Sequence, residues 1–592
     1  MGIVRLSLLI AAIGLLSHGT RADDSPQWRH RPDGNSVSNE TGLPDRFDQI
    51  TGKPAGASLQ NVKWVAPMGS GTFGSPVIAG GKVFVGGFVS QQNTATLWCF
   101  QESDGKLLWQ MRSPLFWKLV NRTWGICSTP AVDGDRVYVL GQHGEVFCLD
   151  ANGLNGRPAS PDDLDLITTG RECPDRNQIA PDGRRIIEMT PGTPGVIQPT
   201  DARIIWRYDM LREVNCWPYN AQSNSILIRG DRLYIATGST LSAFGKDGSR
   251  YATDLWKKKY GKSSYPSPSL IVLDKNTGKL LATDKEGIFD ETFHGAHSSP
   301  VMGAVNGKQL LFYGGGNGSC YAFDPDFAPG DASAPGVLKR VWKFDCLNPA
   351  TFDPAYTGVK LTRAEVVATP VFYNNRVYVS IGNDLAKSGP KAGNGRLLCL
   401  NATQTGDVTA TAKIWSFDDI RNTATTVAIA DGLLFTADAA GNVYCLDADT
   451  GKLYWQHETT PVWSSITIAD GKVYVAARDS LLVFAAARDK KLFGESKVQQ
   501  SMVSSPAVAN GAVYIATGKF LYALQEGKTT VVAKTADPAA PEEVDLLRDR
   551  EKPTGSIAYR LRQFGGPLLC ISAAAWVTAT LIKRSRAKRT HT

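Results

Sequence analysis

The sequence predicts an all-β protein: an eight-bladed β-propeller of four-stranded antiparallel blades, followed by a C-terminal linker and a single transmembrane helix. Three observations predict the propeller. The phrase GNVYCLDADTGKLYWQ at 441–456 recurs along the chain. In most units an aromatic residue follows a Pro, Ile or Val at a fixed spacing. Six units carry a Trp. Self-similarity at a period near 40 residues is typical of propellers, and it overrides the three or four domains that the chain length alone would suggest.

The N-terminal end, residues 1–22, reads as a secretory signal peptide. Arg5 supplies the basic start, an apolar run extends over Leu6–Leu16, and Thr20-Arg21-Ala22 resembles a cleavage site after Ala22. A retained membrane helix is the weaker interpretation, because a span needs about 20 apolar residues. Residues 23–58 are then a lead-in to the propeller.

Eight units are predicted within residues 59–526. Each unit begins at a register residue, which in five units is the Pro of a Ser/Thr-Pro pair, and seven of the units reach an aromatic eight residues later. The unit at Pro300 is longer and reaches Phe312 or Tyr313. The other register pairs are Pro76 and Phe84, Pro130 and Tyr138, Ile226 and Tyr234, Pro370 and Tyr378, Val427 and Phe435, Ile466 and Tyr474, and Pro506 and Tyr514.

Within a unit, TPVFYNNRVYVSIG at 369–382 predicts two short strands joined by a tight Asn-Asn turn. The recurring phrase adds a third strand, an Asp-x-x-Thr-Gly turn and a fourth strand, which completes one blade. We expect Trp in the fourth strand of six units, with Ala282 and Phe493 in its place in the other two. The six are Trp64, Trp109, Trp206, Trp342, Trp415 and Trp455.

The ring is expected to close through its two ends. Trp64 precedes the first complete hairpin, whereas the eighth unit, ending near Leu524, lacks a fourth strand. The strand around Val62–Val65 should therefore complete the last blade and remove a free sheet edge.

The C-terminal end changes character after the propeller. Residues 527–565 have the Pro, Ala and charge content of a linker, 566–582 form an apolar run, and 583–592 form a basic cytoplasmic tail. This order predicts a membrane anchor with the propeller outside. A buried or detachable helix, or a sorting tail that is later clipped, also fits such a short run.

The charge argues against nucleic acid as a partner. The formal net charge is +8, but seven of the basic residues lie in the two ends, so the exported body is nearly neutral. A nucleic-acid-binding protein needs a basic footprint.

The pattern Gly-x-Val-Tyr-x-Leu-Asp-Ala-x-Thr-Gly-Lys-x-x-Trp, best shown at 441–455, resembles the repeat of the PQQ-binding-like, or quinoprotein alcohol dehydrogenase-like, propellers. The stretch SPQWRHRPDGNSVSNETGLP at 25–44 resembles the lead-in of secreted bacterial members. The resemblance covers about residues 25–526. It implies the eight-bladed fold, and either a PQQ- and calcium-dependent dehydrogenase or a cofactor-free scaffold of the cell envelope.

Two departures from the dehydrogenases favour the scaffold. The chain has neither the adjacent Cys-Cys pair that commonly lies against the cofactor nor a Cys-x-x-Cys-His for haem. We therefore expect a non-catalytic, membrane-anchored binding module on the periplasmic side of the envelope, with no cofactor and with an envelope protein or carbohydrate-like ligand as partner. The alternative is a PQQ-dependent dehydrogenase that oxidises an alcohol or sugar.

Eight of the ten cysteines fall into two groups. Cys99, Cys148, Cys399 and Cys445 occupy one slot of the third strand and are expected to be core thiols, because equivalent positions on different blades lie too far apart to bridge. The second group could form disulfides, but the sequence does not fix the pairing. It comprises Cys127, Cys173, Cys216 and Cys346.

One face of the ring is the expected binding face. Connections between blades, together with those between second and third strands, meet there around the channel, and aromatic and cationic side chains there suit a planar or carbohydrate-like ligand. Alternatively, these side chains cap the channel. The candidates are Phe73, Trp124, Trp217, Trp256, Tyr260, His294, His297, Arg421 and Trp463, beside Cys127.

Three further features of the sequence bear on this face and its opposite. His294 and His297, with Asp290 or Glu291, could collect a metal, but ordinary loop hydrogen bonding is the favoured explanation and no metal site is expected. The insertion at 239–267, which holds Trp256 and Tyr260, predicts either a partner-binding flap or a solvated loop on the binding face. A second insertion, about 151–204, should project from the opposite face.

Overall fold

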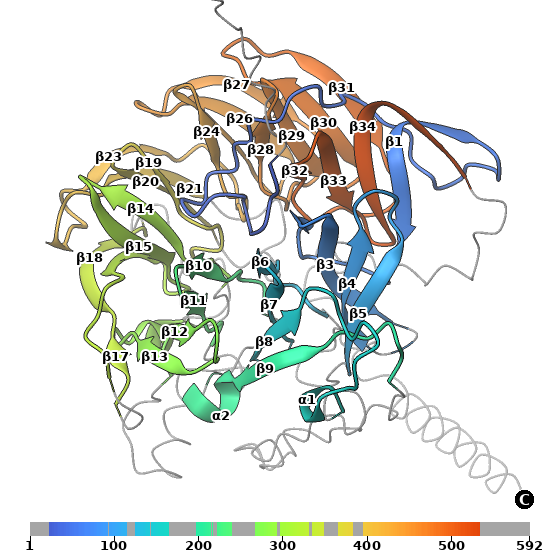
Figure 1. Cartoon of the computed structure of the whole chain (residues 1–592). Coiled ribbons are helices and arrows are strands. Elements are labelled where there is room, and N and C mark those ends of the chain that lie inside the picture. The colour runs from blue at the N-terminus through green and yellow to red at the C-terminus, as the bar shows by residue number, and fades with distance from the viewer. Residues whose placement is uncertain are drawn as a thin grey trace, which may run out of the picture.

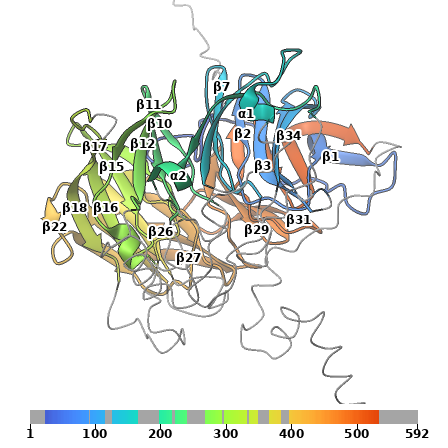
Figure 2. The same cartoon turned by 90° about the horizontal axis from the view of Figure 1, so that it is seen from below.

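The computed structural model describes residues 23–90, 92, 94–114, 125–142, 144–164, 197–214, 216, 222–239, 267–292, 297–330, 334–347, 365–382 and 395–532. The described strands form eight separate sheets arranged in a ring (Figure 1). Figure 2 shows the same ring turned by 90°. The predicted eight-bladed propeller of four-stranded antiparallel blades is confirmed.

The first four blades each run outward from the channel in chain order. Blade 1 contains β2 (Val77–Ala79), β3 (Lys82–Val89), β4 (Thr94–Gln101) and β5 (Leu107–Pro114), and blade 2 contains β6 (Ala131–Asp133), β7 (Arg136–Leu140), β8 (Glu145–Asp150) and β9 (Ile204–Asp209). Blade 3 contains β10 (Leu227–Arg229), β11 (Arg232–Ala236), β12 (Leu270–Asp274) and β13 (Leu280–Thr283), and blade 4 contains β14 (Val301–Val305), β15 (Lys308–Gly314), β16 (Ser319–Asp324) and β18 (Lys339–Asp345).

The last four blades repeat the plan. Blade 5 contains β19 (Val371–Tyr373), β20 (Arg376–Ile381), β21 (Arg396–Asn401) and β23 (Lys413–Phe417), and blade 6 contains β24 (Ala428–Ala430), β25 (Leu433–Ala437), β26 (Asn442–Asp447) and β27 (Leu453–Glu458). Blade 7 contains β28 (Thr467–Ala469), β29 (Lys472–Ala477), β30 (Ser480–Ala485) and β31 (Leu492–Lys497), and blade 8 contains β32 (Ala507–Ala509), β33 (Ala512–Ala516), β34 (Phe520–Val531) and β1 (Ser58–Pro67).

The predicted closure through the chain ends is confirmed. Strand β1 pairs antiparallel with β34, and Trp64 lies opposite Ala523. Figure 1 shows the blue β1 beside the red-orange β34. The first and last strands of the propeller therefore share one sheet.

Short turns explain why the strands pair in this register. The first hairpin of blade 5 turns at Asn374 and Asn375, which both have positive φ, as the tight type I′ turn requires. At the third-to-fourth-strand turn of blade 6, the Asp447 carboxylate accepts hydrogen bonds from the backbone N–H of Asp449 and Thr450 and from the Thr450 hydroxyl. The longer unit at Pro300 forms the same first hairpin, in which Val301 pairs with Phe312.

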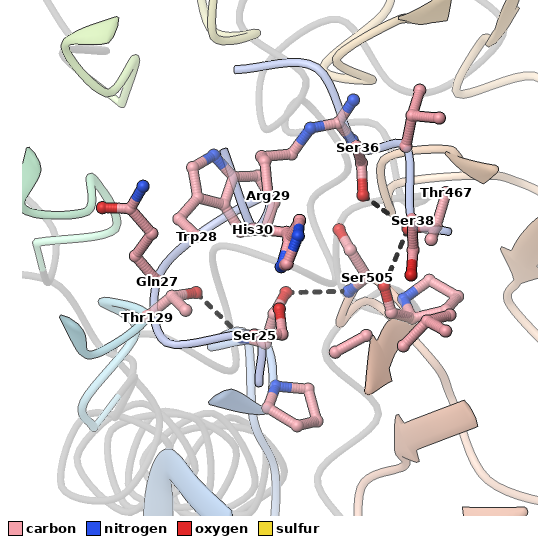
Figure 3. Close-up of a pocket in the computed structure, with 16 residues that line it drawn as sticks. Ser25, Gln27, Trp28, Arg29, His30, Ser36, Ser38, Thr129, Thr467 and Ser505 are labelled. Atoms are coloured by element: carbon pink, nitrogen blue, oxygen red, sulfur yellow. Dashed lines mark hydrogen bonds between the residues drawn. The ribbon is translucent and has the colours of Figure 1, made fainter. Parts of the chain in front are cut away.

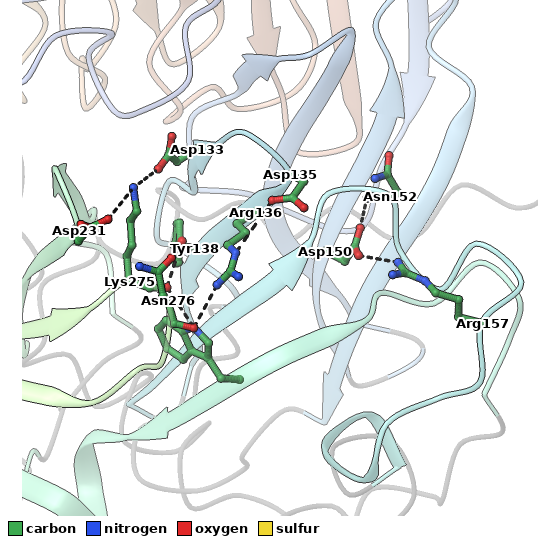
Figure 4. Close-up of polar contacts among 11 residues, drawn as sticks. Asp133, Asp135, Arg136, Tyr138, Asp150, Asn152, Arg157, Asp231, Lys275 and Asn276 are labelled. Carbon is green, nitrogen blue, oxygen red and sulfur yellow. Dashed lines mark hydrogen bonds and ion pairs between the residues drawn. The ribbon is translucent and has the colours of Figure 1, made fainter.

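The hydrophobic core lies between consecutive blades, and the fourth-strand Trp residues join one blade to the next. Trp415 of blade 5 donates its indole N–H to the carbonyl of Ala448 in blade 6 at 3.1 Å, over Gly451. Trp206 and Tyr138 of blade 2 both donate to the carbonyl of Lys275 in blade 3, at 3.1 Å each. Figure 4 shows this interface, where the Lys275 ammonium also pairs with Asp133 and Asp231.

The two blades without Trp use different substitutes. Ala282 in blade 3 takes the Trp register as predicted, opposite Val272, and β17 (Gly336–Val337) lies beside it. In blade 7 the prediction of Phe493 was wrong. The turn before β31 is one residue longer than in blades 1, 3 and 6, so Gly494 lies opposite Val483 and Phe493 falls at the bulge. The backbone of Asp45 in the lead-in occupies the space where a side chain at Gly494 would stand.

Connections from the next blade cover three outer strands. The two-residue strands β17 and β22 (Gly406–Asp407) pair in parallel with β13 and β18, and Asp201 bridges to Gln110 of β5. Two helices, α1 (Pro161–Leu164) and α2 (Met210–Val214), and a 3-10 helix (Ile288–Glu291) complete the described elements. Such covers protect edge strands from pairing with other chains.

The two predicted ends lie outside the described residues, and so does the cysteine Cys173. This applies to the signal peptide at 1–22 and to the apolar run at 566–582. Among the residues that the structure does describe, no helix is both long and apolar enough to cross a bilayer. The core-thiol prediction is confirmed, because Cys99, Cys148, Cys399 and Cys445 are buried and free.

Candidate functional site at the channel

The lead-in crosses the channel, which the sequence did not predict. We call residues 25–37 the channel segment. Its backbone carbonyls accept hydrogen bonds from the middle residue of the innermost strand in blades 1 and 2, where Ser25 and Pro26 bind Ile78 and Val132 at 3.0 and 2.7 Å. The same kind of bond joins the segment to Met302, Phe372 and Ile468 of blades 4, 5 and 7. The segment is therefore held by opposite sides of the ring.

Arg29 fastens the channel segment most firmly. Its side chain is buried, and its guanidinium donates to the backbone carbonyls of Gly34 at 2.9 Å, of Ile466 at 2.7 Å and of Val427. Burial lowers the pKa of Arg29 to about 9, so the guanidinium is still charged at neutral pH. One side chain of the lead-in thus carries a buried positive charge into the channel.

A ring of hydroxyls lies above the channel segment. It consists of the Ser or Thr that precedes the register residue of each blade: Ser75, Thr129, Ser225, Ser299, Thr369, Thr426, Ser465 and Ser505. All eight are buried. Seven bonds, 2.8 to 3.2 Å long, run from the backbone N–H of one member to the hydroxyl oxygen of the next. We call this set the hydroxyl ring, and it joins the blades around the channel.

The hydroxyl ring could have been found from the sequence. The Ser/Thr-Pro pairs that mark five units were used only to set the register. Because equivalent positions of the blades lie at the same depth of the channel, a hydroxyl repeated in every blade has a hydroxyl neighbour on each side. This repeated hydroxyl was the overlooked signal. The channel segment left no such signal, because its bonds to the strands are made mainly by backbone atoms.

The channel mouth lies beyond the hydroxyl ring, three residues before each register residue. We call these eight positions the mouth ring: Phe73, Cys127, Ser223, His297, Val367, Ala424, Trp463 and Val503. Phe73 and Trp463 are half-buried and pack against one hydrophobic cluster with Cys127 and Val503. The structure therefore brings two of the predicted aromatic residues together, on the side of the mouth formed by blades 7, 8, 1 and 2.

The other predicted residues have different environments. His297 is half-buried, and its Nδ1 lies 2.7 Å from the Ser223 hydroxyl across the blade 3 to blade 4 boundary. Arg421 is exposed, and its backbone N–H donates to the buried Asp438 carboxylate at 3.2 Å. The remaining predicted site residues lie outside the described residues: Trp124, Trp217, Trp256, Tyr260 and His294.

Metal and cofactor binding can be assessed only for the described part of the chain. There, no group of three or more His, Cys, Asp or Glu side chains is placed to hold a metal ion. The mouth ring contains no carboxylate that could ligate calcium, and we derive no step through calcium or PQQ from it.

Comparison with known families identifies the chain. The family described as outer membrane protein assembly factor BamB matches residues 23–285, 355–457 and 393–554, which is most of the sequence. This protein belongs to the BamB family. The resemblance to PQQ-binding-like propellers is thereby confirmed.

Solved structures similar to this BamB family member share little sequence with it. BamB from Moraxella catarrhalis has 11% identity and a TM-score of 0.43, and the alignment covers 80% of this chain and 99% of that chain. Quinohemoprotein alcohol dehydrogenase from Comamonas testosteroni has 15% identity and a TM-score of 0.39, with 87% of this chain and 81% of that chain covered. The search of curated proteins found no match.

Proposed function

We propose that this protein is a non-catalytic binding or scaffolding module of the bacterial cell envelope, and that it binds an envelope partner at the channel mouth. Export through the signal peptide at 1–22 and anchoring through the apolar run at 566–582 belong to the same proposal. Membership of the BamB family supports the envelope role. The C-terminal linker would hold the propeller away from the membrane.

The observation that carries the proposal is the composition of the mouth ring. Phe73 and Trp463 offer half-buried aromatic surface against one hydrophobic cluster, and the exposed Arg421 lies six residues before the register residue of blade 6. Aromatic and Arg side chains are enriched among the residues that dominate binding energy at protein interfaces.

Site-specific photocrosslinking in the intact envelope tests the location. A photoreactive residue replaces Arg421 at the mouth or, as the matched control, the exposed Leu492 on the outer strand of blade 7. We expect an adduct of one defined mass from position 421 and none from position 492. Combined Phe73→Ser and Trp463→Ser changes should lower the yield at 421 by about tenfold, a loss of about 1.4 kcal/mol. Equal adducts at both positions would contradict a mouth-specific partner.

The same preparation distinguishes a scaffold from a dehydrogenase. The purified protein, treated with calcium and PQQ, is expected to show no bound quinone by absorption or by mass. Stoichiometric PQQ retained through purification, together with dye-linked oxidation of an alcohol or sugar, would replace our proposal with the enzyme. Trp256→Ala combined with Tyr260→Ala extends the crosslinking test to the insertion at 239–267.

A further inference from the structure

A small cavity separates the channel segment from the hydroxyl ring of blades 8, 1 and 2. Its walls include Trp28, Arg29 and His30 of the channel segment, and Ser75 and Ser505 of the ring. Figure 3 shows Trp28, Arg29, His30 and Ser505 among the side chains that line the cavity. Among the described residues, seven Ser or Thr residues, one Arg and one His line the cavity, and no Asp or Glu does. The wall is therefore rich in hydrogen-bond donors, and its one fixed charge is positive.

Several of these donors lack an acceptor within the described residues. The indole N–H of Trp28 is a buried donor without a hydrogen-bond partner among the described residues. Nδ1 of His30 also lacks one, but burial lowers the pKa of His30, and a neutral imidazole donates through only one of its nitrogens, so Nδ1 is not counted among the donors. The hydroxyl oxygens of Ser75 and Ser505 each accept a backbone N–H from the neighbouring blade, at 3.1 and 2.8 Å, which leaves their protons available. A buried polar atom without a partner costs about 1 to 3 kcal/mol, so such a group of atoms indicates a bound molecule.

Charge decides which kind of molecule fits. The buried Arg29 guanidinium contacts three backbone carbonyls, and none of these contacts is with a carboxylate. The carboxylate of Asp33 acts on Arg29 only at longer range. A buried cation without a contacting anion, beside unused N–H and O–H groups, favours an acceptor with negative charge.

We propose that this cavity binds a small free oxyanion, such as phosphate, sulfate or a carboxylate, which holds the channel segment against the hydroxyl ring. The oxyanion would accept from the Trp28 indole and the ring hydroxyls, in the positive potential of Arg29. This site is separate from the partner face at the mouth, because its walls come from the channel segment and from residues below the mouth ring.

Thermal unfolding and calorimetry of the whole exported protein test the site. Phosphate, sulfate and acetate are titrated separately at constant ionic strength, with chloride as the reference, and a saturable rise in the melting temperature is expected for at least one oxyanion. The order of affinities distinguishes a tetrahedral ligand from a carboxylate. No saturable effect beyond chloride for any of them would overturn the proposal.

Two variants locate the binding. Trp28→Phe keeps an aromatic ring and removes the N–H, so the affinity should fall about tenfold or more, as for a lost bond to a charged group. Trp463→Phe makes the same change at the mouth and should leave the affinity unaltered. His30→Leu is the second cavity variant if Trp28→Phe does not fold. Equal affinities in the cavity and mouth variants, or selenate found crystallographically only on the outer surface, would refute the site.

Discussion

Four docking Trp residues, Trp64, Trp109, Trp206 and Trp415, each lie over a glycine of the blade that receives them. Gly451 has φ of +73°, and a Cβ there would lie 2.6 Å from the Trp415 ring. Gly153 and Gly278 are related in the same way to Trp109 and Trp206. The glycine of the Thr-Gly turn is therefore required for two reasons: its φ is positive, and the indole of the docking Trp leaves no space for a Cβ.

A matched pair of glycines separates these two requirements. Gly471→Ala places a Cβ at φ +62° with no atom within 4 Å, and should cost about 1 kcal/mol for backbone strain alone. Gly451→Ala adds the clash with Trp415 and should cost a further 1 to 3 kcal/mol or so. Urea unfolding of both variants measures the difference. Equal losses would mean that the Trp contact contributes nothing to stability.

Asp284 makes the stability depend on pH. The side chain is buried after β13 and accepts the backbone N–H of Leu270 at 2.6 Å, but burial raises its pKa to about 6. The folded state therefore binds a proton that the unfolded state releases near pH 4. Stability should fall by about 3 kcal/mol as the pH rises from 4 to 7 through this group.

Asp284→Asn removes this titration. Urea unfolding between pH 4 and 7 should show a flatter dependence in the variant than in the unchanged protein, because Asn can still accept from Leu270 but does not ionise. Other carboxylates titrate in both proteins, so only the difference between the two curves reports on Asp284. Parallel curves would contradict the raised pKa.

At the scale of elements, closure of the ring depends on β1. Deletion of residues 25–68 removes both the channel segment and β1, and leaves β34 with an unpaired edge. We expect aggregation or loss of cooperative unfolding, because a long exposed edge strand pairs with other chains. Size-exclusion chromatography and a melting curve measure both effects.

Removal of residues 536–592 is the control for that deletion. It leaves every described strand in place and should change the melting curve little. A protein without residues 25–68 that remains monomeric and melts as the unchanged protein does would refute the role of β1.

The repeat gave the strands, their order and the closing pair, because hairpin turns and the Asp-x-x-Thr-Gly turn are local in sequence. It failed in blade 7, where the turn between the third and fourth strands is one residue longer than in blades 1, 3 and 6, so that counting from the Trp pattern selects Phe493 instead of Gly494. This turn lacks the Thr-Gly pair of the repeat, and the repeat spacing alone does not show its extra residue.

At the scale of the whole molecule, the sequence predicted where the channel mouth lies, but only partly which side chains group together there. Topology placed Phe73, His297 and Trp463 at one depth of the channel, because they hold equal positions before the register residue. Their grouping was not predictable, since it depends on which blades are neighbours across the mouth. The cavity at Trp28 and His30 was also missed, because the segment that forms it belongs to no repeat.

The pairing of β1 with β34 also determines when the last blade can form during synthesis. Gly527 donates to the Asn61 side chain across 466 positions of sequence, so the first strand to be made waits for the last. A chain emerging from the ribosome N-terminus first would carry an incomplete final blade, and a channel segment with few of its partner strands, until nearly the whole propeller has been synthesised. Contacts this distant in sequence fold slowly, and the nascent protein is expected to need protection from aggregation for that entire interval.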